Sequence, residues 1–202
     1  ISFKDVQFFS IDGFCGLSKT DPNSYYYSLT DKFLSKIDAQ EKNIHLLNEE
    51  GTTLEDFERN ANDYNELLEK NPIDLQILSF GENGHIGFNE PNTDFNLLTH
   101  IVELTPEKRE EKSKIFGSLD KTPKYAITQG VENILQAKEV ICIAKDRIYK
   151  WNEKENIQCF ETSAKNGANV DVIFQKIGEL ILANKTEEEI RDVETALEEI
   201  NT

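Results

Sequence analysis

The chain has 202 residues, of which 30% are charged, and its net charge at pH 7 is −16. This acidic balance argues against nucleic acid or an anionic membrane surface as a partner, since both carry negative charge. No apolar run reaches the length of a membrane span, and the cysteines (Cys15, Cys142 and Cys159) lack C-x-x-C spacing, which predicts reduced thiols in a cytoplasmic protein without a zinc site. The chain has no methionine and begins at Ile1, so we expect it to be a piece of a longer protein.

Short apolar runs alternate with helical patterns along the first two thirds of the chain. The runs predict strands at 6–11, 43–47, 73–80, 99–104, 125–130 and 139–144. Helical spacing predicts helices at 25–37, 53–69 and 131–136, whereas 107–116 is highly charged and is expected to be irregular or a short helix. This alternation predicts an α/β fold with a Rossmann-like parallel sheet and helices on both faces.

The segment 73–91 (IDLQILSFGENGHIGFNEP) combines a strand pattern with an unusual polar loop. Glycines recur every third residue from position 81, and the residues between them include an imidazole, two carboxylates and two amides. Ligands of open α/β sheets bind outside the carboxyl ends of strands, so this loop is a candidate reaction site. The alternative is an ordinary glycine-rich surface turn. Asp12 follows another predicted strand and is either a second site carboxylate or a turn former before Gly13.

Several segments between residues 1 and 144 together resemble glucosamine-6-phosphate deaminase. They are FFSIDGFCGLSKTDPNSYYY, NIHLLN, DLQILSFGENGHIGFNEPNTDF, LTHIVEL and TPKYAITQGVENILQAKEVICIA, of which the GENGHIGFNEP loop is the most specific. The resemblance implies a hydrolase of amino-sugar metabolism that converts glucosamine 6-phosphate and water into fructose 6-phosphate and ammonia. It also implies a small sugar-phosphate substrate, no metal, no organic cofactor and an ability to form homo-oligomers.

The resemblance assigns roles to four residues by position. Asp12 matches the base that removes the proton from sugar C2, and a carboxylate can do this if its pKa is tuned by its surroundings. His85 matches the residue that opens the sugar ring, a task suited to a group that titrates near neutral pH. Asn83 and Glu90 match the residues that support this histidine.

The chain also departs from the pattern that it resembles. Gly13 stands where an acid is common, and Lys114 stands where an arginine helps to hold the substrate phosphate. Lysine keeps the charge but lacks the bidentate fork. The phosphate loop of the family would precede Ile1, and its later phosphate-binding lysine is not found after Ala144. Weak or absent turnover is therefore expected, and a catalytically inert α/β binding or structural module is the alternative.

Residues 146–202 give a different pattern from the domain predicted at 1–145. The segment 151–182 resembles the last strand and helix of a Rab-type small GTPase, with E-T-S-A-K at 161–165, so the chain is interpreted as a chimera. The phosphate-cradling P-loop sequence is absent, which makes guanine-nucleotide binding the weakest of the three functional hypotheses. We expect 146–202 to continue the same sheet, followed by an acidic C-terminal helix.

Overall fold

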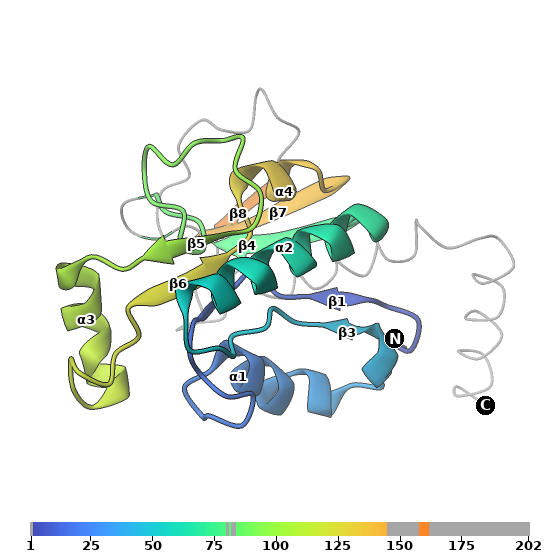
Figure 1. Cartoon of the computed structure of the whole chain (residues 1–202). Coiled ribbons are helices and arrows are strands. Elements are labelled where there is room, and N and C mark those ends of the chain that lie inside the picture. Colours follow the sequence, from blue (N-terminus) through green and yellow to red (C-terminus); the bar gives the residue numbers. More distant parts are fainter. Residues whose placement is uncertain (1, 80, 82–83, 145–157, 162–202) are drawn as a thin grey trace, which may run out of the picture. The chain divides into compact units, whose positions relative to one another are not determined.

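The computed structural model describes residues 2–79, 81, 84–144 and 158–161 (Figure 1). Residues Ser2–Cys142 form one compact unit, and strand β8 (Gln158–Glu161) belongs to a second. Almost all of the segment predicted as small-GTPase-like, and the predicted acidic C-terminal helix, lie outside the described residues. Among the described helices, none has the length and apolar character needed to cross a membrane.

Helices and strands alternate along the chain, which confirms the predicted α/β class. In chain order they are β1 (Phe8–Phe9), β2 (Asp12–Phe14), α1 (Tyr25–Lys32), the 3-10 helices η1 (Leu34–Lys36) and η2 (Glu41–Asn43), β3 (Ile44–His45), α2 (Leu54–Lys70), β4 (Leu75–Ser79), β5 (His100–Glu103), α3 (Pro106–Phe116), β6 (Tyr125–Thr128), α4 (Val131–Leu135) and β7 (Glu139–Ala144). The predicted helix at 25–37 is shorter than expected, because α1 ends at Lys32 and η1 follows it.

The described strands include parallel pairs, as predicted, but they fall into three groups instead of one continuous parallel sheet. Strands β1 and β3 are parallel, whereas β2 and β5 both pair antiparallel with β6, and β4 and β7 are neighbours in a third sheet. The predicted strand at 6–11 divides at Ser10, where the chain changes partners. There the Gln129 side chain donates to the Ser10 carbonyl at 2.9 Å, and the Ser10 hydroxyl accepts from Leu47 N at 2.8 Å. These side-chain hydrogen bonds satisfy backbone groups outside a ladder.

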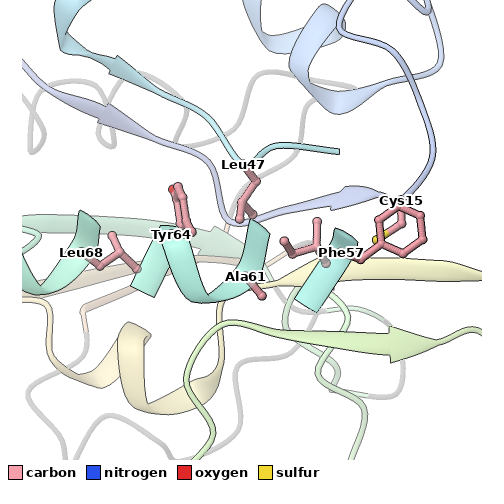
Figure 2. Packing of buried hydrophobic residues seen from close by; sticks show 7 residues of the cluster. Cys15, Leu47, Phe57, Ala61, Tyr64 and Leu68 are labelled. Atoms are coloured by element: carbon pink, nitrogen blue, oxygen red, sulfur yellow. The ribbon is translucent and has the colours of Figure 1, made fainter. Parts of the chain in front are cut away.

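Helix α2 provides the main hydrophobic face of this unit. Its N-terminus is fixed by a capping box between Thr53 and Asp56. Residues at helical spacing, Phe57, Ala61, Tyr64 and Leu68, then form one buried stripe that packs with Cys15 and Leu47 (Figure 2). Ile127 belongs to the same cluster. The Tyr64 hydroxyl donates to the Ser10 carbonyl at 2.8 Å, so the helix also holds the chain where β1 leads into β2.

Candidate active site

A cavity of about 200 Å³ lies where β2, α3 and the loop after β4 meet. Its polar lining includes Asp12 from β2, His85 and Glu90 from the loop, and Lys108 and Lys112 from α3. Three of the predicted site residues, Asp12, His85 and Glu90, therefore share one cavity. The fourth, Asn83, lies outside the described residues.

Asp12 is held beside the loop by the pairing of β2 with β6. It lies opposite Thr128, whose hydroxyl accepts from Phe88 N at 3.3 Å. Gly87 passes directly over this pair with φ 58°, and a Cβ there would lie 2.7 Å from Thr128 Oγ1 and 3.3 Å from Asp12 Oδ2. Both the positive φ and the space therefore require glycine. Burial raises the pKa of Asp12 to about 7.

His85 lies against the first glycine of the loop. A Cβ on Gly81 would collide with the imidazole ring, and Gly81 N donates to the His85 carbonyl at 2.8 Å. Burial lowers the pKa of His85, and the charge of Lys108 lowers it further, while Glu90 opposes both. Because the ordinary value is near 6.5, the ring is mainly neutral at pH 7 and can accept a proton.

Helix α3 supplies the positive charge of the cavity. Of the two alternatives expected for 107–116, an irregular segment or a short helix, the structure shows a helix of 11 residues. Thr105 caps it, Pro106 occupies its first turn and Gly117 ends it at φ 80°. Lys108 Nζ lies 3.1 Å from Glu90 Oε1. Lys112 is one turn further on and lines the same cavity.

Lys114, the residue predicted to contact phosphate, is exposed and is not among the described residues that line the cavity. Residues two apart on a helix point in different directions, and of these two lysines Lys112 lines the described cavity. Lys108 and Lys112 were not among the predicted site residues, because no helical register had been assigned to 107–116 to show which lysines share a face. The Thr105-Pro106 start was the signal that could have identified them.

Aromatic contacts join three walls of the cavity. The Phe14 ring lies edge-on to Tyr25 from α1, Phe88 from the loop and Phe116 from the end of α3, with centroid distances of 5.2, 5.2 and 5.3 Å. Phe14 is 1% exposed and lies two residues from Asp12 on β2. The strand that carries the carboxylate is therefore packed against the elements that carry the other lining residues.

The arrangement can transfer protons on an anionic molecule. A carboxyl with a pKa near 7 and a neutral imidazole can each act as acid or base at neutral pH, and two ammonium groups face the same space. In the part of the chain that the structure describes, no group of three His, Cys, Asp or Glu side chains is placed to hold a metal ion.

Known proteins resemble the chain over the region that builds this cavity. The family model described as glucosamine-6-phosphate isomerases/6-phosphogluconolactonase matches residues 1–148. The glucosamine-6-phosphate deaminase of Streptococcus gordonii is 40% identical over 144 residues, 71% of this chain and 59% of that protein. The corresponding Staphylococcus aureus (strain Newman) protein is 41% identical over 146 residues, covering 71% of this chain and 57% of that protein.

Solved structures agree with these matches. A monomeric glucosamine-6-phosphate deaminase is similar with a TM-score of 0.64 at 36% identity, over 70% of this chain and 58% of the other. The 6-phosphogluconolactonase of Thermotoga maritima has a TM-score of 0.53 at 14% identity, over 73% and 61%, and shares the fold alone. The chain spans less than two thirds of the length of each of these relatives.

These matches correct three sequence-based interpretations. The class of hydrolase is wrong, because the relatives at about 40% identity are deaminases of an isomerase family. The small-GTPase interpretation and the chimera are withdrawn, because neither has support and the family model runs past the predicted junction at residue 145.

Proposed function

The chain belongs to the glucosamine-6-phosphate isomerase/6-phosphogluconolactonase family, and we propose that its cavity binds glucosamine 6-phosphate and catalyses deamination to fructose 6-phosphate. The observation that carries this proposal is the convergence of Asp12, His85 and two lysines on one cavity from separate elements. The names of the relatives at about 40% identity favour the deaminase over the lactonase activity of the family.

His85 acts in the first step, in which the sugar ring opens. Its neutral imidazole accepts the proton of the anomeric hydroxyl and returns a proton to the ring oxygen, so that the bond from C1 to the ring oxygen breaks. The product is the open-chain aldehyde. The negative charge of Glu90 raises the pKa of His85 against the effects of burial and Lys108. This helps the ring hold the proton during transfer.

Asp12 acts in the second step as the base at C2. It takes the C2 proton while the electrons of that C–H bond form the C1–C2 double bond and the C1 oxygen gains a proton. Return of a proton to C1 leaves an iminium at C2, which water attacks with loss of ammonia. A carboxylate whose pKa is about 7 is a stronger base than an ordinary one and remains substantially ionised at neutral pH.

Lys108 and Lys112 provide the charge that an anionic substrate requires. Lys108 is already paired with Glu90, so it also fixes the position of that carboxylate. Lys112 pairs with its neighbour Glu111 at 2.9 Å, a contact that a dianionic phosphate can displace because Glu111 is 58% exposed. Lys114, to which the resemblance assigned this role, is exposed and does not line the described cavity, so its contact with phosphate stays a prediction.

An ammonia-coupled assay of the full chain with glucosamine 6-phosphate tests the proposal. Replacing Asp12→Asn should lower the rate by about 10²- to 10⁴-fold, the usual contribution of a general base. Asp63→Asn, which removes an exposed carboxylate from α2, is the matched control and should leave the rate unchanged. Equal rates in wild type and Asp12→Asn would contradict the role of Asp12. No ammonia from wild type would favour the inert module.

The predictions of a cytoplasmic location, of homo-oligomers and of a support role for Asn83 remain proposals. Size-exclusion chromatography with light scattering of the full chain measures the oligomeric state directly.

A further inference from the structure

Glu49 lies in the segment between β3 and α2 and is 3% exposed. Its two carboxylate oxygens accept hydrogen bonds from different elements of the candidate site. Oε2 accepts from Phe14 N of β2 at 3.1 Å, and Oε1 accepts from Tyr26 N in the first turn of α1 at 2.8 Å. A single side chain thereby joins the strand that carries Asp12 to the helix that carries Tyr25, and both of these residues line the cavity.

The side chain of Glu49 occupies the space beside Gly13. A Cβ at residue 13 would lie 2.6 Å from Glu49 Cγ and 2.7 Å from its Cδ, distances at which one of the two side chains would have to shift. Residue 13 is the position where an acid was expected, and the structure supplies the carboxylate from residue 49 instead. Glycine at 13 therefore leaves the space that the Glu49 side chain fills, and a side chain at residue 13 would displace that of Glu49.

The surroundings keep this carboxylate electrically coupled to the site. Burial raises the pKa of Glu49 to about 7, the hydrogen bonds from Tyr26 and Phe14 oppose this, and the charge of Asp12 raises it further. The titratable groups that face it are Asp12 and Cys15 from β2 and its continuation, and Tyr25 from α1. Burial raises the pKa of Cys15 to about 12, and the charge of Glu49 adds to this shift. Burial also raises the pKa of Tyr25 to about 12, with smaller contributions from the charges of Asp12 and then Glu49.

From these contacts we infer that Glu49 is a positioning residue for Asp12: it fixes β2 against the N-terminus of α1 and so sets the place of the base in the cavity. The inference rests on the proposed function, because it assigns Glu49 a part in the same reaction. Glu49 does not line the cavity and acts through the backbone of β2.

The first test is an NMR titration of the full 202-residue chain that needs no turnover. In wild type, the Phe14 and Tyr26 amide protons should both shift with one midpoint near pH 7, because both donate to Glu49. Glu49→Gln, which keeps the shape of the side chain, should abolish this titration. Glu50→Gln, an exposed neighbouring change, should preserve it. Amide protons that do not titrate, or that titrate equally in Glu49→Gln, would overturn the inference.

The reciprocal variant tests the coupling to the base. Asp12→Asn should lower the midpoint at the two amides by roughly 1 pH unit, because a like charge is removed. The ¹³C signal of the Asp12 carboxyl should titrate in two steps in wild type and in one step in Glu49→Gln. An unchanged midpoint, or two steps in Glu49→Gln, would refute the coupling.

A kinetic arm separates this inference from the proposed function. Glu49→Gln should lower kcat for ammonia release by roughly 10- to 100-fold with little change in KM, because misplacement of a base affects the chemical step. An unchanged kcat with altered amides would overturn the positioning role alone. Absence of ammonia from wild type would overturn the proposed function, and the NMR titrations would then still decide whether Glu49 governs Asp12.

Discussion

Helix α2 and the cavity beside β2 bury side chains of opposite chemistry within one compact unit. Along α2 the buried residues are apolar or, like Tyr64, have their polar atom hydrogen-bonded to backbone carbonyls. Around the cavity, two carboxyl groups are held where burial raises the pKa of each to about 7. Burial of the apolar side chains stabilises the folded state. Burial of the two carboxyl groups destabilises their ionised forms, and this leaves them able to exchange protons near neutral pH.

The largest effect on stability is expected from loss of a core side chain on α2. Phe57→Ala removes a ring that is 6% exposed and packed in the core, and should lower the free energy of unfolding by about 3–5 kcal/mol. Urea denaturation measures the change, which should be the same at pH 5 and pH 8 because no titrating group is removed. Leu54→Ala on the same helix is the control, since Leu54 is 44% exposed and should cost far less. A strongly pH-dependent loss for Phe57→Ala would contradict the separation of the two regions.

Local pattern was sufficient to predict α2 but not the cavity. The buried stripe follows helical spacing and the Thr53 cap is adjacent in sequence, so both signals lie within one segment. The carboxylate of Glu49 contacts Phe14 across 35 residues, and its space exists only because residue 13 is glycine. Position in the family pattern predicted Asp12, His85 and Glu90, which line one cavity, but no local period could reveal that Glu49 lies beside them.

The second prediction concerns the Gly13 and Glu49 pair. Gly13→Ala should destabilise the chain by about 1–3 kcal/mol through overpacking, because its Cβ would meet Glu49 Cγ. In the Glu49→Ala background the same substitution should cost much less, since the colliding atoms are gone. Urea denaturation of wild type, both single variants and the double variant forms the cycle, and additive costs would show that the two residues do not share this space.

The third prediction is that Asp12→Asn stabilises the chain at alkaline pH. The unfolded carboxyl ionises near pH 4, whereas the folded pKa is about 7, so the folded state binds more protons between these values. Stability of wild type should therefore fall as pH rises from 4 to 7 and level off above pH 7. His85 contributes in the opposite direction below pH 6.5, since its folded pKa is lowered.

The variant should lack the contribution of Asp12 to this slope. At pH 8 we expect Asp12→Asn to be more stable than wild type by on the order of 1–2 kcal/mol, less than the full shift because Asp12 is only half-buried. The advantage should disappear at pH 4, where both side chains are neutral. Denaturation curves at the two pH values measure the difference in stability. A variant less stable than wild type at pH 8 would show that burial of ionised Asp12 does not destabilise the fold.

The smallest expected effect separates two lysines on α3. Lys112 lines the cavity, and Lys114, two residues later, is exposed. Replacing each lysine by glutamine removes the same charge, so any difference between the two variants reflects position alone. A charge-assisted hydrogen bond to phosphate is worth about 1.5–3 kcal/mol, and the lower value applies because Lys112 must leave its pairing with Glu111. At about 1.4 kcal/mol per decade, Lys112→Gln should therefore weaken binding of fructose 6-phosphate by roughly 10-fold. Lys114→Gln should change it less than about 2-fold, as expected for an exposed charge screened by water. Calorimetric titration with fructose 6-phosphate, repeated at high salt, measures both. The opposite order would assign the phosphate to Lys114, as the resemblance predicts, and would contradict the role proposed for Lys112.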